Sequence, residues 1–185
     1  MGSEMCIRDR DGTAVKTPGS NIFPYIKKNL DDIITVEDDE LIVAFLDMVE
    51  NHKMIVENSG LLTVAALKHL GVKDKRVVSI LSGGNMDVIT MSSVVQQGLI
   101  FRDRIFTVSV LLPDKPGELA KVSQTLADVQ GNVIKLEHNQ FVTTNRSAAV
   151  ELRITLECFG TEHKEQIIAA LEKKGYKPRI VRTMI

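Results

Sequence analysis

The chain has 185 residues, of which 44% are hydrophobic and 25% are charged, and its formal net charge is −1 at pH 7. This is the composition of a globular protein with one or two domains, and the near-neutral charge gives no reason to expect nucleic acid as a partner. We expect neither a membrane span nor a signal peptide. Cys6 and Cys158 lie far apart without metal-ligand spacing, so we expect no disulfide, no metal site and a reducing cytoplasm.

Residues 1–10 are set apart from the remainder of the sequence. They read Met-Gly-Ser-Glu-Met-Cys-Ile-Arg-Asp-Arg, which one reading frame of a transposon-end sequencing adapter encodes with a GTG start. We therefore expect a non-native scar that belongs to no fold. The natural sequence is expected to begin at Asp11, where a gene has been cut by the boundary of a sequencing read.

The segment 11–100 alternates short apolar runs with helical periodicities, as in an α/β sheet. A loop over 11–19 is followed by a helix that Ser20 or Asn21 can cap. Further helices are expected over 37–52, from Asn58 or Ser59 to Gly71, and from Asp87 onward. Strands are expected over 33–36, 54–56 and 77–81.

The stretch Val77–Asp87 is the centre of this predicted sheet. An apolar run ends in Ser82-Gly83-Gly84-Asn85, and Asp87 then opens a helical pattern. Ligands of open α/β sheets bind beyond the carboxyl ends of the strands, and glycine allows the backbone to approach a bound group closely. The stretch is therefore either a ligand-binding loop or a tight strand-to-helix turn with a polar cap.

A second unit follows a linker over 98–104. Strands are predicted over 106–112, 132–138, 148–156 and 176–181, and helices over 117–128 and from Thr161 to Gly175. The alternation of apolar and polar residues over 148–156 is the clearest in the chain. The order βαββαβ predicts an α+β ferredoxin-like fold, with the last strand on an edge of the sheet because of Pro178.

Four segments occur in one order along the chain and carry a family resemblance: 11–19, 56–60, 82–85 and 112–119. Together they resemble the carboxyl-terminal part of threonine ammonia-lyase (threonine dehydratase), a pyridoxal-phosphate (PLP) enzyme of fold type II. The last of them is similar to the ACT regulatory domain. The resemblance runs from Asp11 to the end of the chain. It implies an incomplete catalytic domain over 11–100 and an ACT domain over 104–185.

The resemblance also implies which residues contact the cofactor. Ser82 matches the residue whose hydroxyl meets the pyridine nitrogen, Gly83, Gly84 and Asn85 would form the wall behind the ring, and Glu57 matches an acid near it. A neutral hydroxyl leaves the ring a moderate electron sink, which suits elimination of water from threonine or serine. No lysine matches the one that binds the cofactor, so we expect no catalytic residue here and no activity of this chain alone.

In the ACT part, the resemblance implies an effector-binding loop made of Asp114, Lys115, Pro116, Gly117 and Glu118, together with Asn132. The helix amides after Gly117 could bind a carboxylate. Gln130-Gly131-Asn132 departs from the usual Gly-x-Asn, which leaves the end of the preceding helix open. The ACT part either binds an amino acid or only makes a homo-oligomer.

Two functions from different classes follow. The first is a part of a PLP-dependent threonine ammonia-lyase, which converts threonine to 2-oxobutanoate and ammonia, with an ACT domain that senses isoleucine or valine. The alternative is a stand-alone ACT-type module that binds amino acids or dimerises without catalysis. Reading the source DNA upstream of Asp11 would separate them.

Overall fold

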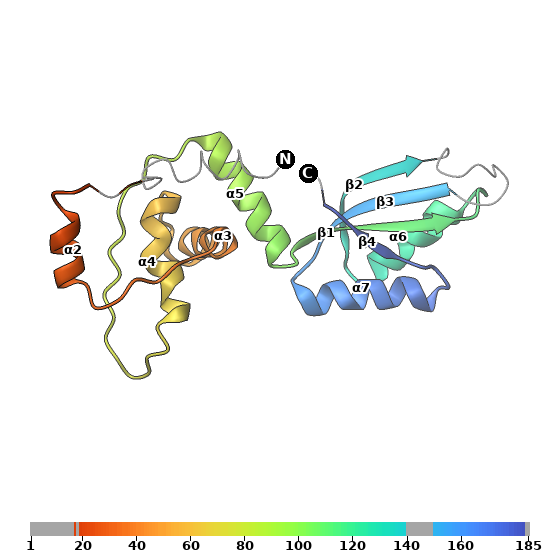
Figure 1. Ribbon diagram of the computed structural model, residues 1–185. Helices are drawn as coiled ribbons and strands as arrows, with labels where there is room; N and C mark the ends of the chain where they lie inside the picture. Colours follow the sequence, from red (N-terminus) through yellow and green to blue (C-terminus); the bar gives the residue numbers. More distant parts are fainter. Residues whose placement is uncertain (1–16, 18, 140–149, 184–185) are drawn as a thin grey trace. The chain divides into compact units, whose positions relative to one another are not determined.

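The computed structural model describes residue 17 and residues 19–139 and 150–183, and the chain divides after Gly98 into two units. The predicted scar, Cys6 and the expected start of the strand at Ala148 lie outside the described residues. We describe unit 1 (residues 1–98) and unit 2 (residues 99–185) separately (Figure 1).

All the regular secondary-structure elements in the described part of unit 1 are helices or helical turns. Its elements are α2 (Phe23–Asn29), α3 (Asp38–Asp47), the π-helical turn η1 (Met48–His52), the 3-10 turn η2 (Asn58–Leu61), α4 (Leu62–Ala65), the 3-10 turn η3 (Ala66–His69) and α5 (Val88–Phe101), which continues into unit 2. The core forms where α3 meets the 58–65 segment and α5, and Phe45 and Leu61 are fully buried in it. The start of α3 follows from sequence, because Glu37 and Glu40 form a reciprocal capping box.

The three strands predicted in unit 1 are not formed within the described residues. Segments 33–36, 54–56 and 77–81 are extended but pair with no neighbouring strand. Val78 and Ile80 are 89% and 72% exposed. The strand predictions for these segments are therefore wrong for this chain: a strand needs a partner for its backbone groups, and the described part of unit 1 supplies none.

Two helix predictions in unit 1 also need correction. The helix predicted after the loop over 11–19 forms as α2, but neither Ser20 nor Asn21 caps it, because its N-cap residue is Ile22. Its apolar side chains are exposed rather than buried: Ile22, Phe23, Ile26 and Leu30. The predicted helix up to Gly71 breaks into η2, α4 and η3, and neither Asn58 nor Ser59 caps it. Glycine and β-branched residues at 60, 63 and 64 are weak helix formers, which accounts for the short pieces.

Unit 2 is built on a four-stranded antiparallel sheet in the order β2-β3-β1-β4. Its strands are β1 (Ile105–Leu112), β2 (Asn132–Asn139), β3 (Val150–Glu157) and β4 (Arg179–Val181), with α6 (Glu118–Asp128) after β1 and α7 (Thr161–Lys173) after β3. This is the predicted ferredoxin-like arrangement, and β4 is the edge strand that Pro178 indicated. The predicted linker is shorter than expected, because α5 continues to Phe101.

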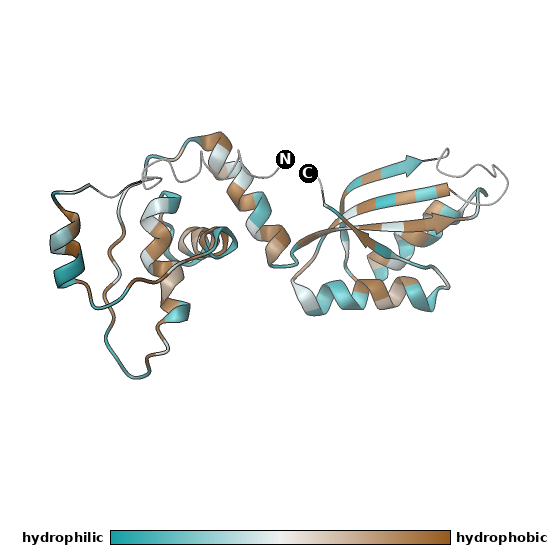
Figure 2. Cartoon of the chain, in the orientation of Figure 1, coloured by the Kyte–Doolittle hydropathy of each residue, from teal (hydrophilic) through white to brown (hydrophobic). Residues whose placement is uncertain are grey.

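Alternation along the strands separates the two faces of this sheet (Figure 2). Val108, Ile154 and their neighbours point toward α6 and α7 and are fully buried with Leu126, Ile167 and Leu171. The opposite face carries Thr107, Ser109, Glu151, Arg153 and Thr155, in register across β1 and β3. We call it the helix-free face. It is polar, whereas the helix-covered face forms the hydrophobic core.

The turn between α6 and β2 shows how the shifted glycine is accommodated. Gln130 has φ +60°, so it occupies the left-handed position where the family pattern has glycine. A Cβ on Gly131 would lie 3.2 Å from Cδ1 of Ile167, so this glycine serves close packing instead. Helix α6 therefore ends as expected at Asp128, at the cost of one strained residue.

Candidate functional site

Two loops of unit 1 that were singled out separately in the sequence lie against each other. The backbone N–H of Glu57 donates to the carbonyl oxygen of Gly83 over 3.4 Å. A second link joins the same segments, because the Thr63 hydroxyl donates to the carbonyl oxygen of Ile80 over 2.9 Å. The structure thus brings Glu57 together with the Ser82–Asn85 loop, as a shared site requires.

Glycines make this close contact possible. A Cβ on Gly60 would stand 1.7 Å from the carbonyl oxygen of Ser82, and a Cβ on Gly83 would stand 2.2 Å from Oε1 of Glu57. Gly83 also has φ +78°, a conformation that favours glycine over all other residues. Gly84 is less constrained, with the carbonyl oxygen of Ile55 3.6 Å from its hypothetical Cβ. Gly60 and Gly83 are therefore required by the contact between the loops.

The side chains of Glu57 and Asn58, which lie beside this contact, differ in their hydrogen bonding. The Ser59 hydroxyl donates to Oε1 of Glu57 over 2.7 Å, which orients the carboxylate toward Gly83. Asn58 is only 5% exposed, and its Oδ1 has no hydrogen-bond partner in the described part of the chain. A buried polar atom without a partner is rare in a complete site. The Oδ1 of Asn58 is therefore a buried acceptor that the described residues leave without a donor.

Ser82 and Asn85 are exposed at the tip of the same loop. A serine hydroxyl both donates and accepts a hydrogen bond and carries no charge. Just beyond, Asp87 begins α5: its carboxylate accepts from the N–H of Thr90 at 3.0 Å and from the Thr90 hydroxyl at 2.6 Å. The Thr90 hydroxyl, followed by its N–H, holds the pKa of Asp87 below its usual range. Asp87 therefore caps the helix, and the exposed Ser82 hydroxyl takes no part in this cap.

The predicted effector loop in unit 2 is an exposed turn between β1 and α6. Asp114, Lys115, Pro116 and Gly117 are exposed, and Gly117 has φ +90° immediately before the first residue of α6. Glu118 is held by Lys121, whose Nζ lies 2.7 Å from Oε1. This hydrogen bond raises the pKa of Lys121. The loop is therefore an exposed turn whose only charged partner within the described residues is the Glu118–Lys121 pair inside α6.

Asn132 does not join that loop within one chain. It pairs with Glu157 across β2 and β3 and donates to Oε2 of that residue over 3.0 Å. Glu157 in turn pairs with Ile105, at the opposite end of β1 from the loop. Eight-residue strands span roughly 23 Å, so Asn132 and the loop lie at opposite ends of the sheet.

A polar group on the helix-free face was not singled out from sequence, although the alternation placed its members on one face. The Ser109 hydroxyl donates to Oε1 of Glu151 over 2.6 Å, and Nε of Arg153 donates to Oε2 over 3.1 Å. The bond from Ser109, followed by that from Arg153, holds the pKa of Glu151 below its usual range. Only cross-strand register reveals that these three side chains form one chain of hydrogen bonds.

Comparison with known proteins assigns both parts of the chain to families. Residues 9–83 match the family described as "Pyridoxal-phosphate dependent enzyme", and residues 106–175 match the ACT domain. The first part is thus similar to a segment of PLP-dependent enzymes, and the second is similar to ACT domains. Both agree with the resemblance found from sequence.

Curated relatives of the chain carry the names threonine ammonia-lyase or threonine dehydratase. The chain is 37% identical over 168 residues to an L-threonine ammonia-lyase of Geobacter sulfurreducens, covering 90% of this chain and 42% of that protein. It is 34% identical to the L-threonine ammonia-lyase of Thermotoga maritima over 92% of this chain and 43% of that protein. An "L-threonine dehydratase biosynthetic IlvA" of Pasteurella multocida is 31% identical, and the match covers 90% of this chain and 32% of that protein. The chain therefore spans about two fifths of the length of the first two relatives.

Solved structures also match, at a lower level of identity. A formyltetrahydrofolate deformylase from Pseudomonas syringae pv. tomato is 22% identical with a TM-score of 0.32, and the match covers 49% of this chain and 32% of that one. The residues that the structure describes include no helix long and apolar enough to cross a membrane, and no group of three His, Cys, Asp or Glu side chains that could hold a metal ion.

Proposed function

We propose that this chain is part of a PLP-dependent threonine ammonia-lyase and that the Ser82–Asn85 loop forms one side of its cofactor site. The observation that carries the proposal is the convergence of Glu57 with Gly83, because residues 26 positions apart in sequence meet where the family resemblance requires them. The lyase relatives and the match to the PLP-dependent enzyme family support the same reaction class.

The residues present fit the cofactor at this loop. Ser82 offers an exposed neutral hydroxyl for the pyridine nitrogen. Beside the loop, Oδ1 of Asn58 is a buried acceptor without a hydrogen-bond donor in the described part of the chain. Gly83, Gly84 and Asn85 would lie behind the ring. When bound, the cofactor supplies the electron sink for loss of water from threonine. Ser82 would hold the ring without forcing a proton onto its nitrogen, and Glu57 would fix the position of Gly83.

The test places this sequence behind a complete PLP-binding half from a lyase relative and measures 2-oxobutanoate formation from threonine. Ser82→Ala should lower turnover and cofactor affinity together, since the ring loses its partner. Ser93→Ala, an exposed serine on α5, is the matched control. Unchanged turnover and cofactor affinity in Ser82→Ala would contradict the proposed role. The chain by itself should show no lyase activity, because no residue in it matches the cofactor-binding lysine.

For unit 2 we propose a regulatory role, in which the loop Asp114–Glu118 of one ACT domain and Asn132 of a second copy bind an amino acid between them. The separation of the loop from Asn132 within one chain supports this arrangement, since one copy cannot bring them together. Isoleucine or valine is the proposed effector, consistent with a relative named as a biosynthetic threonine dehydratase. A cytoplasmic location and domain boundaries at 11–100 and 104–185 belong to the same proposal.

Calorimetric titration of the chain with isoleucine, valine and threonine tests the regulatory role, with sedimentation to follow assembly. We expect heat from isoleucine or valine that is lost in Asp114→Ala and in Asn132→Ala. Lys173→Ala, exposed on α7, is the control. A folded dimer that gives no heat with any of the three would favour the alternative function, a module that only dimerises.

A further inference from the structure

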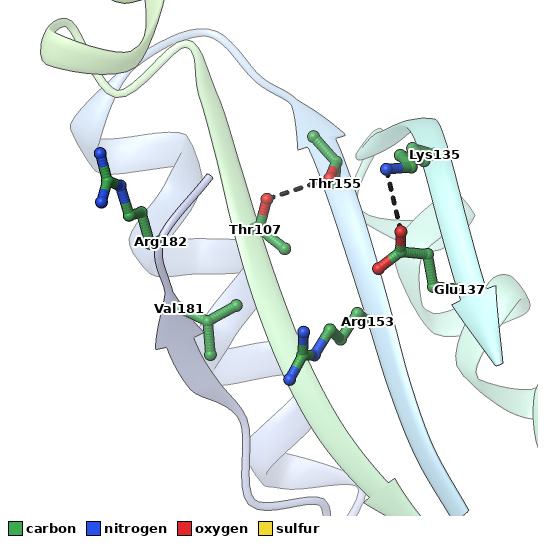
Figure 3. A pocket seen from close by; sticks show the side chains of 7 residues that line it. All are labelled: Thr107, Lys135, Glu137, Arg153, Thr155, Val181 and Arg182. Carbon is green, nitrogen blue, oxygen red and sulfur yellow. Dashed lines mark hydrogen bonds and ion pairs between the residues drawn. The ribbon is translucent and has the colours of Figure 1, made fainter. Parts of the chain in front are cut away.

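A cavity of about 260 Å³ opens on the helix-free face of the unit 2 sheet (Figure 3). Its floor is the pair Thr107 and Thr155, whose hydroxyl oxygens lie 3.0 Å apart and whose residues are 6% and 4% exposed. Strands β1, β2, β3 and the end of β4 all contribute to it. Because its floor is a hydrogen-bonded pair of hydroxyls, the cavity suits a polar ligand better than a hydrophobic one.

The walls of this cavity carry more positive than negative charge. Lys135, Arg153 and Arg182 line it, and Glu137 is the one acid among its lining residues. Lys135 and Glu137 form an ion pair at 2.9 Å. Arg182 is exposed and forms no ion pair with any residue in the described ranges. Arg153 is paired with Glu151 at 3.1 Å. Among the charged side chains that line the cavity, the charge of Arg182 is therefore the one that no described acid balances.

Arg153 is held in position before any ligand arrives. Its Nε–H is used on Glu151, which is 8% exposed and is itself held by Ser109 from the neighbouring strand. A guanidinium carries four further N–H donors in a plane that matches the oxygens of a carboxylate or phosphate. Fixing one edge of the group lowers the entropy lost when the others bind an anion.

We propose that this cavity binds a small oxyanion, a carboxylate or a phosphate, on Arg153 above the two threonine hydroxyls, with Arg182 at the rim of the cavity. The volume admits only a small ligand, since pockets for drug-sized molecules begin at roughly 300 Å³. The site lies on the face opposite α6 and α7 and uses none of the residues proposed to bind cofactor or amino acid effector. This proposal can therefore be tested independently of the proposed function.

The experiment is a titration of the whole chain with malonate and, separately, with inorganic phosphate, at constant ionic strength set with sodium chloride. Backbone amide NMR shifts locate the binding. We expect saturable shifts at Thr107, Arg153 and Thr155 with at least one probe, and the tighter probe identifies the oxyanion class. Arg182→Gln should weaken that binding about tenfold, as loss of about 1.4 kcal/mol implies.

Lys173→Gln is the matched control, because it makes the same change of charge on α7, which covers the other face. It should leave the affinity within about twofold. Arg182 and Lys173 are both exposed, so neither variant is expected to unfold the unit, and far-UV circular dichroism verifies this. The proposal is overturned if neither probe gives saturable shifts, if the shifts map to the Asp114–Glu118 loop, or if Lys173→Gln weakens binding as much as Arg182→Gln.

Discussion

Gly60 and Ser82 are in backbone contact: a Cβ on Gly60 would stand 1.7 Å from the Ser82 carbonyl oxygen and 2.9 Å from Cγ1 of Val56. No side chain, however small, fits between the two loops at this point. The position of the Ser82 hydroxyl therefore depends on a glycine 22 residues earlier in the chain.

Gly60→Ala should separate the two loops. The added methyl group meets backbone rather than a flexible side-chain end, so the loop must move, and overpacking of this kind costs about 1–3 kcal/mol. We expect amide hydrogen exchange at Glu57, whose N–H donates to Gly83, to rise by about tenfold or more. Gly19→Ala is the control, since nothing lies within 4 Å of its hypothetical Cβ. Equal exchange in both variants would contradict the close approach.

Asp87→Ala should loosen the first turn of α5. The carboxylate accepts from the N–H groups of Ile89 and Thr90, which have no partner inside the helix. The pKa of Asp87 is lowered in the folded state. The charged cap therefore stabilises the helix at pH values above the pKa of Asp87 in the unfolded chain, and this stabilisation is lost as the pH falls through its pKa in the folded chain. Amide exchange at Ile89 and Thr90 measures this. Asp87→Asn should keep most of the protection without the dependence on acid pH.

Gln130→Gly should stabilise unit 2. Gln130 has φ +60°, where a side chain costs about 1–2 kcal/mol, and part of that gain is offset by the greater freedom of glycine in the unfolded chain. We expect a net gain of about 0.5–1 kcal/mol in the free energy of unfolding by urea. Gln130→Ala retains the strain and should change little. Gly131→Ala should destabilise instead, because its Cβ would approach Ile167 to 3.2 Å.

Glu151→Gln should destabilise unit 2 at neutral pH by about 1–3 kcal/mol, because hydrogen bonds to a charged acceptor become hydrogen bonds to a neutral one. The pKa of Glu151 lies below its ordinary value of 4.5, so the carboxylate contributes fully above that pH. The contribution of this carboxylate to stability is lost as the pH falls from 4.5 through the pKa of Glu151 in the folded protein. Urea unfolding from pH 7 to pH 3 should therefore show wild type and variant converging in acid. Glu172→Gln, exposed on α7, should follow wild type throughout.

Hydrogen exchange along the whole chain should be unequal between the units. Amides of β1 and β3 lie at the centre of a paired sheet over a buried core, so they should be strongly protected. Amides of 77–80 have no strand partner among the described residues, so they should exchange rapidly. Protection over 77–80 equal to that of β1 would show that unit 1 is as stable as unit 2.

Several features of this protein were predictable from sequence because they depend on local periodicity. The alternation over 106–112 and 150–156 places every second residue on one face of a strand, whatever the strand's neighbours are. The order of strands and helices then restricts the topology to the ferredoxin-like fold, and Pro178 assigns the last strand to an edge. The glycines at 60 and 83 were also visible in the sequence, as parts of the motifs that indicated a PLP enzyme.

Tertiary structure alone decided which of these features meet. Sequence spacing cannot show that Glu57 contacts Gly83, that Asn132 lies at the far end of the sheet from Asp114, or that 77–81 lacks a partner strand. Each of these depends on pairing between distant segments, and register across strands is set by the assembled sheet rather than by either strand. The same register joins Ser109, Glu151 and Arg153, and so holds the one member of this group that lines the cavity on the helix-free face, Arg153.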